Sequence, residues 1–165
     1  MTRIVVGVDG SGNSKRALQR AIAEAKLRGG TVDAVFTYEP PGSSLSDDLV
    51  GLARSAAAPL GASSVDGPAQ ADGSDEQGAQ QEAERRLGAF VEGVPTDGDG
   101  PQPKLLAIPN KHPAAALIEE SKTADLLVVG TRGIGGLKGM LLGSVAHQCI
   151  QHSHCPVLVM PAEHN

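Results

Sequence analysis

Residues 126–150 read LLVVGTRGIGGLKGMLLGSVAHQCI and decide the fold class. The stretch opens with an apolar run at Leu126–Val129 and continues through a turn that holds six glycines between Gly130 and Ser144. An apolar run without alternation is typical of a strand that is buried on both faces of a parallel sheet. The spacing of Val145, Ala146, Cys149 and Ile150 then indicates one face of a helix. The stretch therefore predicts a buried strand, a glycine-rich turn and a helix in immediate succession.

The rest of the chain repeats this alternation of strand and helix. Similar apolar runs occur at Ile4–Val8, Val32–Thr37, Lys104–Ile108 and Val157–Met160. Helical patterns occur at Asn13–Arg28, at about Glu76–Glu92, and from Pro113 onward. Strands that alternate with helices predict a doubly wound α/β sheet of five parallel strands with right-handed crossovers. Such sheets bind ligands beyond the carboxyl ends of their strands.

The first two helical patterns each define a buried face. In the first, the apolar stripe consists of Ala17, Leu18, Ala21, Ile22 and Ala25, and Gly29-Gly30 ends the helix. In the second, the buried side is predicted to hold Ala83, Leu87, Phe90 and Val91. One segment breaks the alternation, because residues 39–75 are rich in Pro, Gly, Ser, Ala and Asp and contain few large apolar residues. We expect a single domain over residues 1–165, with this low-complexity insertion as either a lid or a disordered loop.

Composition excludes several classes of function. The formal net charge is -5, and the chain contains no Trp, one Tyr and two Phe. An acidic chain without stacking aromatics is not expected to bind nucleic acid, which requires a clustered basic surface. No apolar run approaches the length of a membrane span. The two cysteines, Cys149 and Cys155, fit a reducing compartment better than a disulfide framework, so we expect a cytoplasmic protein.

The glycine-rich turn has the properties of a polyphosphate site. Glycines permit positive φ and let backbone N–H groups approach a ligand, and the helix that starts near Ser144 points its free N–H groups into the same space. Arg132 and Lys138 would neutralise charge, and the Ser144 hydroxyl would serve as an N-cap or as a phosphate ligand. The known glycine motifs for phosphate loops and dinucleotides do not match. The spacing that remains is G-x-x-G, nine residues, then G-S, formed by Gly130, Gly133, Gly143 and Ser144.

On these residues the sequence resembles the universal stress protein family, in the subclass that binds ATP. The resemblance extends over IVVGVDGS at residues 4–11, the first helix, HPAAALIEESKTADLLVVGTRG at residues 112–133, and LLGSVAHQCIQHSHCPVLVM at residues 141–160. It implies the adenine nucleotide alpha hydrolase-like, Rossmann-like sandwich with strand order 3-2-1-4-5. It also implies ATP, with Mg²⁺, at the carboxyl edge, and homodimers that pair through the last strand, Pro156–Met160.

The resemblance also implies a role for each matching position. Gly7, Val8, Asp9 and Ser11 would lie on the adenine and ribose side, and Thr37 would meet the adenine edge. Gly130, Arg132, Gly133 and Gly135 would surround the ribose and phosphates. Gly143, Ser144 and Val145 would hold the terminal phosphates. Asp9 would also be placed to help hold Mg²⁺.

Several functions remain open at the level of sequence. The preferred interpretation is a nucleotide-dependent regulator of the stress response that binds ATP without rapid turnover. The alternatives are a slow ATPase or phosphotransferase at the same site, a family member that binds no nucleotide, and a flavin or dinucleotide carrier. A metal site is not expected at His147, Cys149, His152, His154 and Cys155, because their spacing matches no common zinc pattern.

Overall fold

The computed structural model describes residues 1–41, 73–96, 98–134 and 142–162. The five expected strands are present as β1 (Arg3–Gly7), β2 (Thr31–Tyr38), β3 (Lys104–Pro109), β4 (Leu126–Gly130) and β5 (Val157–Met160). All neighbouring strands are parallel, and their order is β3-β2-β1-β4-β5. The predicted strand order is therefore confirmed, with β1 at the centre and β3 and β5 at the edges.

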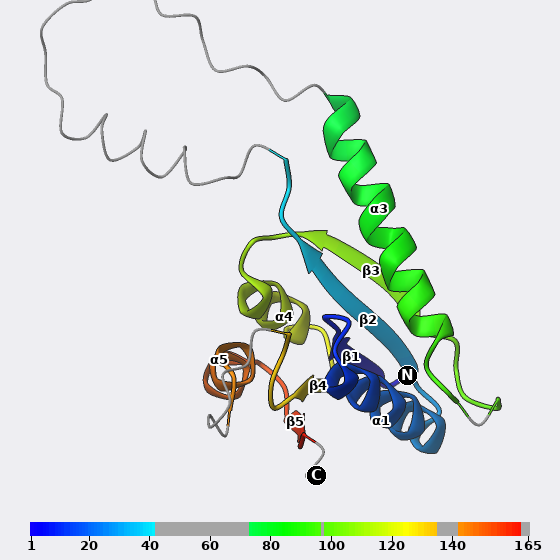
Figure 1. Ribbon diagram of the computed structural model, residues 1–165. Helices are drawn as coiled ribbons and strands as arrows, with labels where there is room; N and C mark the ends of the chain where they lie inside the picture. Colours follow the sequence, from blue (N-terminus) through cyan, green and yellow to red (C-terminus); the bar gives the residue numbers. More distant parts are fainter. Residues whose placement is uncertain (42–72, 97, 135–141, 163–165) are drawn as a thin grey trace, which may run out of the picture.

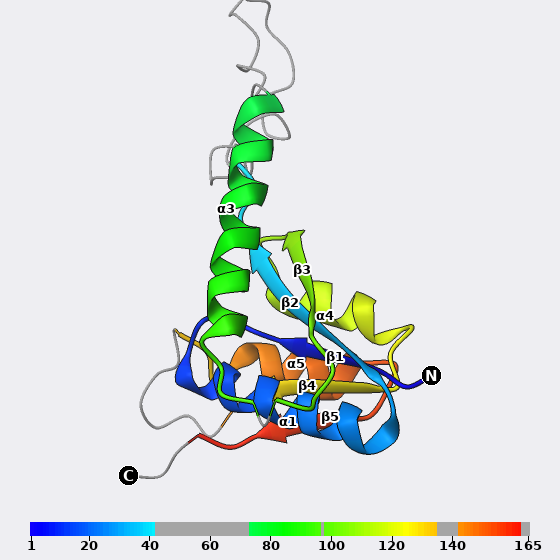
Figure 2. The ribbon, with the colours of Figure 1, turned by 90° about the vertical axis from the view of Figure 1, so that its right-hand side faces the viewer.

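Helices cover both faces of this sheet (Figures 1 and 2). On one face lie α1 (Gly12–Arg28) and α3 (Gly73–Glu92), and on the other lie α4 (Pro113–Ser121) and α5 (Ser144–His152). No helix in the described ranges combines the length and the apolar character that a bilayer crossing requires.

The core consists of two clusters, one on each face of the sheet. Along β1, Ile4 and Val6 pack toward α1 and α3, whereas Val5 packs toward α4 and α5. Strand β4 alternates in the same way, with Val128 on the first face and Leu127 on the second. All five side chains are fully buried, as expected for central strands of a parallel sheet.

The edge strands differ from this expectation. Every residue of β5 is only half-buried, and Lys104 and Leu105 of β3 are exposed. A continuous apolar run therefore did not mean burial on both faces for these two strands. An edge strand has one neighbour in the sheet, so the helices beside it cover less of its surface.

Helix α1 forms as its sequence predicts. Its apolar stripe, Ala17, Leu18, Ala21, Ile22 and Ala25, is buried against the sheet. The Ser11 side chain accepts a hydrogen bond from the Ser14 N–H and caps the start of the helix. Gly29 adopts a left-handed conformation, with φ of 60°, and ends it.

Helix α3 begins at Gly73, within the range expected for the insertion and before the expected start at about Glu76. Its first turns extend past the carboxyl ends of β2 and β3 (Figures 1 and 2). The later turns pack on the sheet through Ala83 and Leu87, which are buried, and through the partly buried Phe90 and Val91. The expected buried side is thus confirmed, while residues 42–72 of the expected insertion lie outside the described residues.

A polar network joins three elements and a turn at the amino edge of the sheet, opposite the carboxyl ends of the strands. Arg3 Nε donates to Asp33 Oδ2 at 2.8 Å, and Arg3 Nη2 donates to Glu120 Oε2 at 2.6 Å. The Arg3 backbone N–H donates to Asp125 Oδ2 at 2.8 Å. Burial acts to lower the pKa of Arg3, but the hydrogen bonds and charges of Glu120 and Asp33 outweigh it and the pKa is raised. Arg3 therefore stays charged and ties β1 to β2, α4 and the turn before β4.

Candidate functional site

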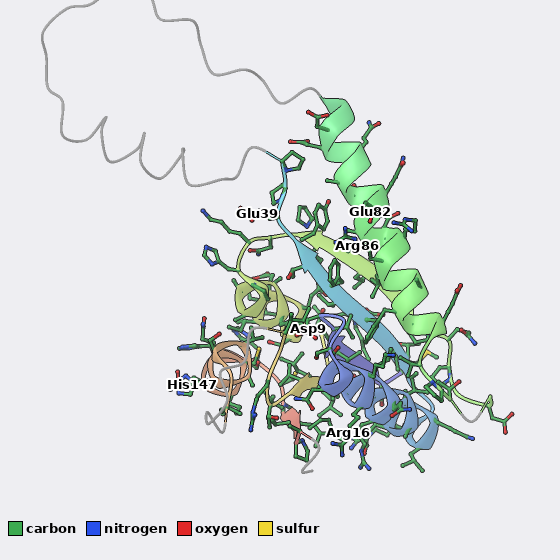
Figure 3. All side chains as sticks on the ribbon, in the orientation of Figure 1. Asp9, Arg16, Glu39, Glu82, Arg86 and His147 are labelled. Atoms are coloured by element: carbon green, nitrogen blue, oxygen red, sulfur yellow. The ribbon has the colours of Figure 1, made fainter. Side chains whose placement is uncertain are left out.

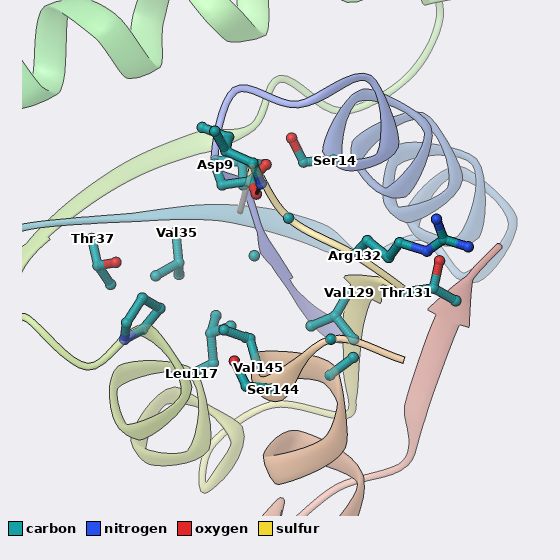
Figure 4. Close-up of a pocket in the computed structure, with 18 of the residues that line it drawn as sticks. Asp9, Ser14, Val35, Thr37, Leu117, Val129, Thr131, Arg132, Ser144 and Val145 are labelled. Carbon is teal, nitrogen blue, oxygen red and sulfur yellow. Dashed lines mark hydrogen bonds between the residues drawn. The ribbon is translucent and has the colours of Figure 1, made fainter. Parts of the chain in front are cut away.

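A cavity of about 660 Å³ opens at the carboxyl ends of β1, β2 and β4 (Figure 4). Its volume lies in the range of small-molecule sites. Strand ends supply Gly7, Val8, Asp9, Val35, Phe36, Thr37, Val129 and Gly130. Helices supply Ser14, Pro113, Leu117, Ser144, Val145 and Ala146, and the turns supply Thr131, Arg132, Gly133, Ile134 and Gly143. The cavity lies where a doubly wound sheet places its ligands.

At three glycines of the predicted motif, which all line this cavity, an added Cβ would crowd or collide with a neighbouring atom. A Cβ at Gly130 would lie 2.8 Å from Asn13 Nδ2. A Cβ at Gly133 would collide with the Asp9 carboxylate, and one at Gly143 would lie 3.2 Å from the Thr131 carbonyl oxygen. The spacing G-x-x-G, then G-S, therefore marks places where the backbone of the turn approaches its neighbours closely.

Positive φ is not the reason for these three glycines. Among the described glycines, positive φ occurs at Gly10, Gly29 and Gly98, which lie elsewhere. The sequence argument had relied on conformational freedom as well as on close approach. At Gly130, Gly133 and Gly143, the close approach that the structure shows is to Asn13, Asp9 and Thr131 of the chain itself, and the expected approach to a ligand stays a prediction.

Asp9 holds the end of the turn to the end of β1. Its Oδ1 accepts from the Ser11 N–H, and its Oδ2 accepts from the Ile134 N–H, both at 2.9 Å. Asp9 lies at the loop that joins β1 to α1 (Figure 3) and lines the cavity. Both carboxylate oxygens are therefore already hydrogen-bonded within the chain, although each keeps a further lone pair for a ligand or for Mg²⁺.

The start of α5 offers free backbone N–H groups to the cavity. Its N-cap is Gly143, and no side chain in the described part of the chain caps it. The first bond of the helix runs from the His147 N–H to the Gly143 carbonyl, at 3.0 Å. The N–H groups of Ser144, Val145 and Ala146 precede that bond, and all three residues line the cavity. Partial positive charge therefore gathers at this wall.

Ser144 is not the N-cap that the sequence also allowed. The cap is Gly143, and Ser144 is the first residue of the helix, with an exposed side chain at the cavity wall. Its hydroxyl is thus left available for a ligand.

The start of α4, which faces the same cavity, offers less. Its first residue is Pro113, which has no N–H, and the Ala115 N–H donates to the His112 carbonyl at 3.0 Å. Leu117 follows one turn later and gives this wall an apolar surface. The cavity is therefore apolar beside α4 and rich in donors beside α5.

Of the sequence-predicted site residues that the structure describes, all except Ser11 line the cavity. Gly7, Val8, Asp9, Thr37, Gly130, Arg132, Gly133, Gly143, Ser144 and Val145 line the cavity. Ser11 does not line it, because its hydroxyl caps α1. Gly135 lies outside the described residues, as does Lys138. The Arg132 side chain extends toward Thr131 and away from Val35 and Thr37 (Figure 4).

Sequence reasoning missed the apolar wall and the residues that hold the turn. Val35 and Val129 were assigned only to strands, and Leu117 only to a helix, yet all three line the cavity. Because they lie in separate elements, no local pattern could indicate that they meet. Ser14 and Thr131 were also missed, although Thr131 stands between the predicted residues Gly130 and Arg132.

The cysteines and histidines near the chain end do not converge. Cys149 is fully buried in the core, and burial raises the pKa of its thiol to about 11. His147 and His152 are exposed on α5, and His147 lies on its outer side (Figure 3). Among the described residues, no group of three or more His, Cys, Asp or Glu side chains is arranged to hold a metal ion.

Comparison with known proteins matches residues 1–161 to the model of the Universal stress protein family. Universal stress protein Rv2005c of Mycobacterium tuberculosis is 33% identical over 160 residues, covering 94% of this chain and 44% of that protein. The chain thus spans less than half of the length of that relative.

Solved structures show the same fold. UspA from Lactobacillus plantarum superposes with a TM-score of 0.57 at 16% identity, covering 96% of this chain and 97% of that one. A universal stress protein solved in complex with cAMP superposes with a TM-score of 0.52 at 24% identity, covering 96% of this chain and 95% of that one. The expected adenine nucleotide alpha hydrolase-like fold is confirmed. Because the family model spans nearly the whole chain, the chain belongs to the universal stress protein family.

Proposed function

We propose that the cavity binds ATP, accompanied by Mg²⁺, and that occupancy makes this protein a nucleotide-dependent regulator in the cytoplasm. The uncapped start of α5, at the wall of a 660 Å³ cavity, carries the proposal. Anions bind at helix starts because the free N–H groups and the helix dipole favour negative charge. The N–H groups of Ser144, Val145 and Ala146 would hold the terminal phosphates, and the Ser144 hydroxyl would add a donor.

The opposite wall suits a base. Val35 and Leu117 are buried apolar residues at this wall, and Thr37 adds a hydroxyl and backbone polar groups at its rim. An adenine ring would therefore lie between β2 and α4, with the ribose near Asp9 and Gly130. The universal stress protein solved with cAMP supports the choice of an adenine nucleotide as the ligand.

The described walls favour binding over turnover. General base catalysis requires a group that reaches the attacking water, and Asp9 is the one carboxylate among the described cavity-lining residues. Both of its oxygens accept backbone N–H groups, and we place it beside the ribose rather than beside the γ-phosphate. We therefore propose a binding module in preference to an ATPase.

Nucleotide identification tests this proposal. Protein purified without added nucleotide is denatured, and the supernatant is analysed by mass spectrometry. Nucleotide-free protein is then titrated with Mg-ATP, AMP and cAMP in a calorimeter. We expect ATP to bind more tightly than AMP, because the terminal phosphates contribute. Equal affinity for AMP and ATP would contradict phosphate binding at α5, and no binding of any of the three would reject the nucleotide proposal.

We further propose a homodimer that pairs through β5. Strand β5 is an edge strand, and its pairing with β4 uses the carbonyls of Pro156 and Met160, which accept from Leu127 and Thr131. The alternate residues Val157 and Val159 therefore direct their backbone groups away from β4, where a second copy could pair.

The substitution Val159→Pro tests the dimer. It removes one outward N–H without removing a bond to β4, so we expect a folded monomer in sedimentation analysis where the parent protein is a dimer. A dimer that persists in this variant would place the interface elsewhere.

A further inference from the structure

The glycine-rich turn is held from outside by a side chain of α1. Asn13 Nδ2 donates to Thr131 Oγ1 at 3.2 Å and to the Arg132 carbonyl oxygen at 3.1 Å. Both acceptors follow β4 directly and both residues line the cavity. The two bonds join segments 118 and 119 residues apart in the chain.

Gly130 leaves the space in which this amide sits. A Cβ at Gly130 would lie 2.8 Å from Asn13 Nδ2 and 3.0 Å from Asn13 Cγ. One of the two glycines of the G-x-x-G pair is therefore explained by a residue outside the motif. Asn13 and Gly130 fit together as a pair.

Thr131 connects Asn13 to the start of α5, because it accepts hydrogen bonds from both Asn13 and Gly143. The Thr131 carbonyl accepts from the Gly143 N–H at 2.6 Å, and its Oγ1 also accepts from the Ala162 N–H at 3.1 Å. The Thr131 N–H donates to the Met160 carbonyl at 2.8 Å. A shift of Thr131 would consequently move the N-cap of α5 and the free N–H groups that follow it.

The same contacts leave polar atoms unpaired. Asn13 Oδ1 and Arg132 Nε are buried without a hydrogen-bond partner in the described part of the chain. Buried polar atoms are normally paired, since leaving one unpaired destabilises the fold. The arrangement is thus one that fixes the turn in place at some cost in stability.

We propose that Asn13 is a positioning residue for the anion-binding wall, acting through Thr131 on the start of α5. It does not touch the ligand. It holds the turn so that Gly143 and the N–H groups after it keep a fixed distance from the strand ends. The effect of Asn13 on the position of α5 is independent of the ligand, whereas its effect on ATP affinity rests on the proposed function.

The first test needs no ligand. Amide hydrogen exchange is followed at Gly143 in Asn13→Ala and in the control Gln19→Ala. Gln19 lies on the same helix, and its Nε2 also donates to a backbone carbonyl, that of Pro95, at 3.0 Å. We expect exchange at Gly143 to become about tenfold faster in Asn13→Ala and to stay unchanged in the control. Unchanged exchange in both variants, or an equal rise in both, would overturn the proposal.

The second test uses the fit between Asn13 and Gly130. Gly130→Ala alone forces the new Cβ against the Asn13 amide, whereas in the Asn13→Ala background that collision is absent. We expect the double variant to melt at a higher temperature than the sum of the single changes implies. Strictly additive losses would contradict the direct pairing of these two residues.

The third test measures Mg-ATP affinity by calorimetry in the same variants. A neutral hydrogen bond contributes on the scale of a few-fold to about tenfold, so we expect Asn13→Ala to weaken binding by about tenfold. Gln19→Ala should bind like the parent protein. Faster exchange at Gly143 without weaker binding would overturn the effect of Asn13 on ATP affinity. A parent protein that binds no nucleotide would reject the proposed function, and the exchange test alone would then decide whether Asn13 positions the start of α5.

Discussion

The starts of α1 and α5 both meet the cavity, but the chain completes them differently. At α1, the Ser11 hydroxyl accepts from the Ser14 N–H, and Ser14 Oγ donates to the Ser11 carbonyl at 2.9 Å. At α5, Gly143 provides no side chain, and the first N–H groups have no side-chain cap among the described residues. The start of α1 is therefore capped by a side chain, and the start of α5 is not.

This difference separates α5 from α1, whereas α4, which also has no side-chain cap, begins with a proline that has no N–H. A capped start has used part of its donor capacity, so an anion gains little there. With glycine as its N-cap, α5 forgoes only about a few tenths of a kcal/mol relative to a helix with a side-chain cap. The uncapped start of α5 beside the cavity is therefore the place where we propose that an anion binds.

Adding a side-chain cap to the start of α5 should have the largest effect, a loss of Mg-ATP affinity. Gly143→Asp adds a cap whose carboxylate occupies the anion position and repels phosphate, so we expect Mg-ATP affinity to fall about 100-fold, or ~2.8 kcal/mol. Gly143→Ala adds the same Cβ, 3.2 Å from the Thr131 carbonyl, without the cap. Calorimetry should show a clearly smaller loss for Ala than for Asp. Equal losses would mean that crowding, rather than capping, explains the effect.

Displacing the turn should have the next largest effect. A Cβ at Gly133 meets the Asp9 carboxylate, so Gly133→Ala should destabilise the protein by about 1–3 kcal/mol. The control is Gly12→Ala at the start of α1, where a Cβ meets nothing within 4 Å. Denaturant unfolding would measure the free energy of unfolding of both variants. A Gly133→Ala protein as stable as the control would show that the turn shifts to accommodate the new Cβ without loss of stability.

Removing the hydroxyl at α5 should have a moderate effect on the ligand alone. Ser144 is not the N-cap, so Ser144→Ala should leave the melting temperature unchanged. We expect Mg-ATP affinity to fall about tenfold, or ~1.4 kcal/mol, if the hydroxyl donates to a phosphate. Unaltered affinity would leave the backbone N–H groups as the sole donors at this wall.

Removing the side-chain cap of α1 should have the smallest effect, and it should lower stability without changing Mg-ATP affinity. Ser11→Ala loses the bond to the Ser14 N–H, so the free energy of unfolding should fall by about 1 kcal/mol. Affinity for Mg-ATP should not change, because Ser11 does not line the cavity. Weaker binding in this variant would restore the ligand role that the family resemblance implied for Ser11.

The sequence predicted the fold well because local patterns determine its elements. Apolar runs gave all five strands, and the Ser11 to Gly29 stretch contained both the stripe and the stop of α1. The glycine and serine spacing also predicted four residues that line the cavity, Gly130, Gly133, Gly143 and Ser144. These features depend on residues that are neighbours in the chain.

The remaining features depend on residues that meet only after folding. Leu117 and Val35 form the apolar wall from different elements, and Asn13 reaches Thr131 across the sheet edge. The exposure of β3 and β5 does not follow from their apolar composition either, because strand order decides which strands are edges, and the expected order 3-2-1-4-5 came from the family resemblance.

The Arg3 network carries a practical consequence for anyone modifying this protein. It lies at the amino edge of the sheet, and none of its side chains lines the cavity. Engineering for heat tolerance can therefore begin with Arg3, Asp33 and Glu120 and their surroundings, while changes in ligand preference are sought at the other end of the same strands. Substitutions for stability and substitutions for ligand preference can therefore be made at different residues of the same fold.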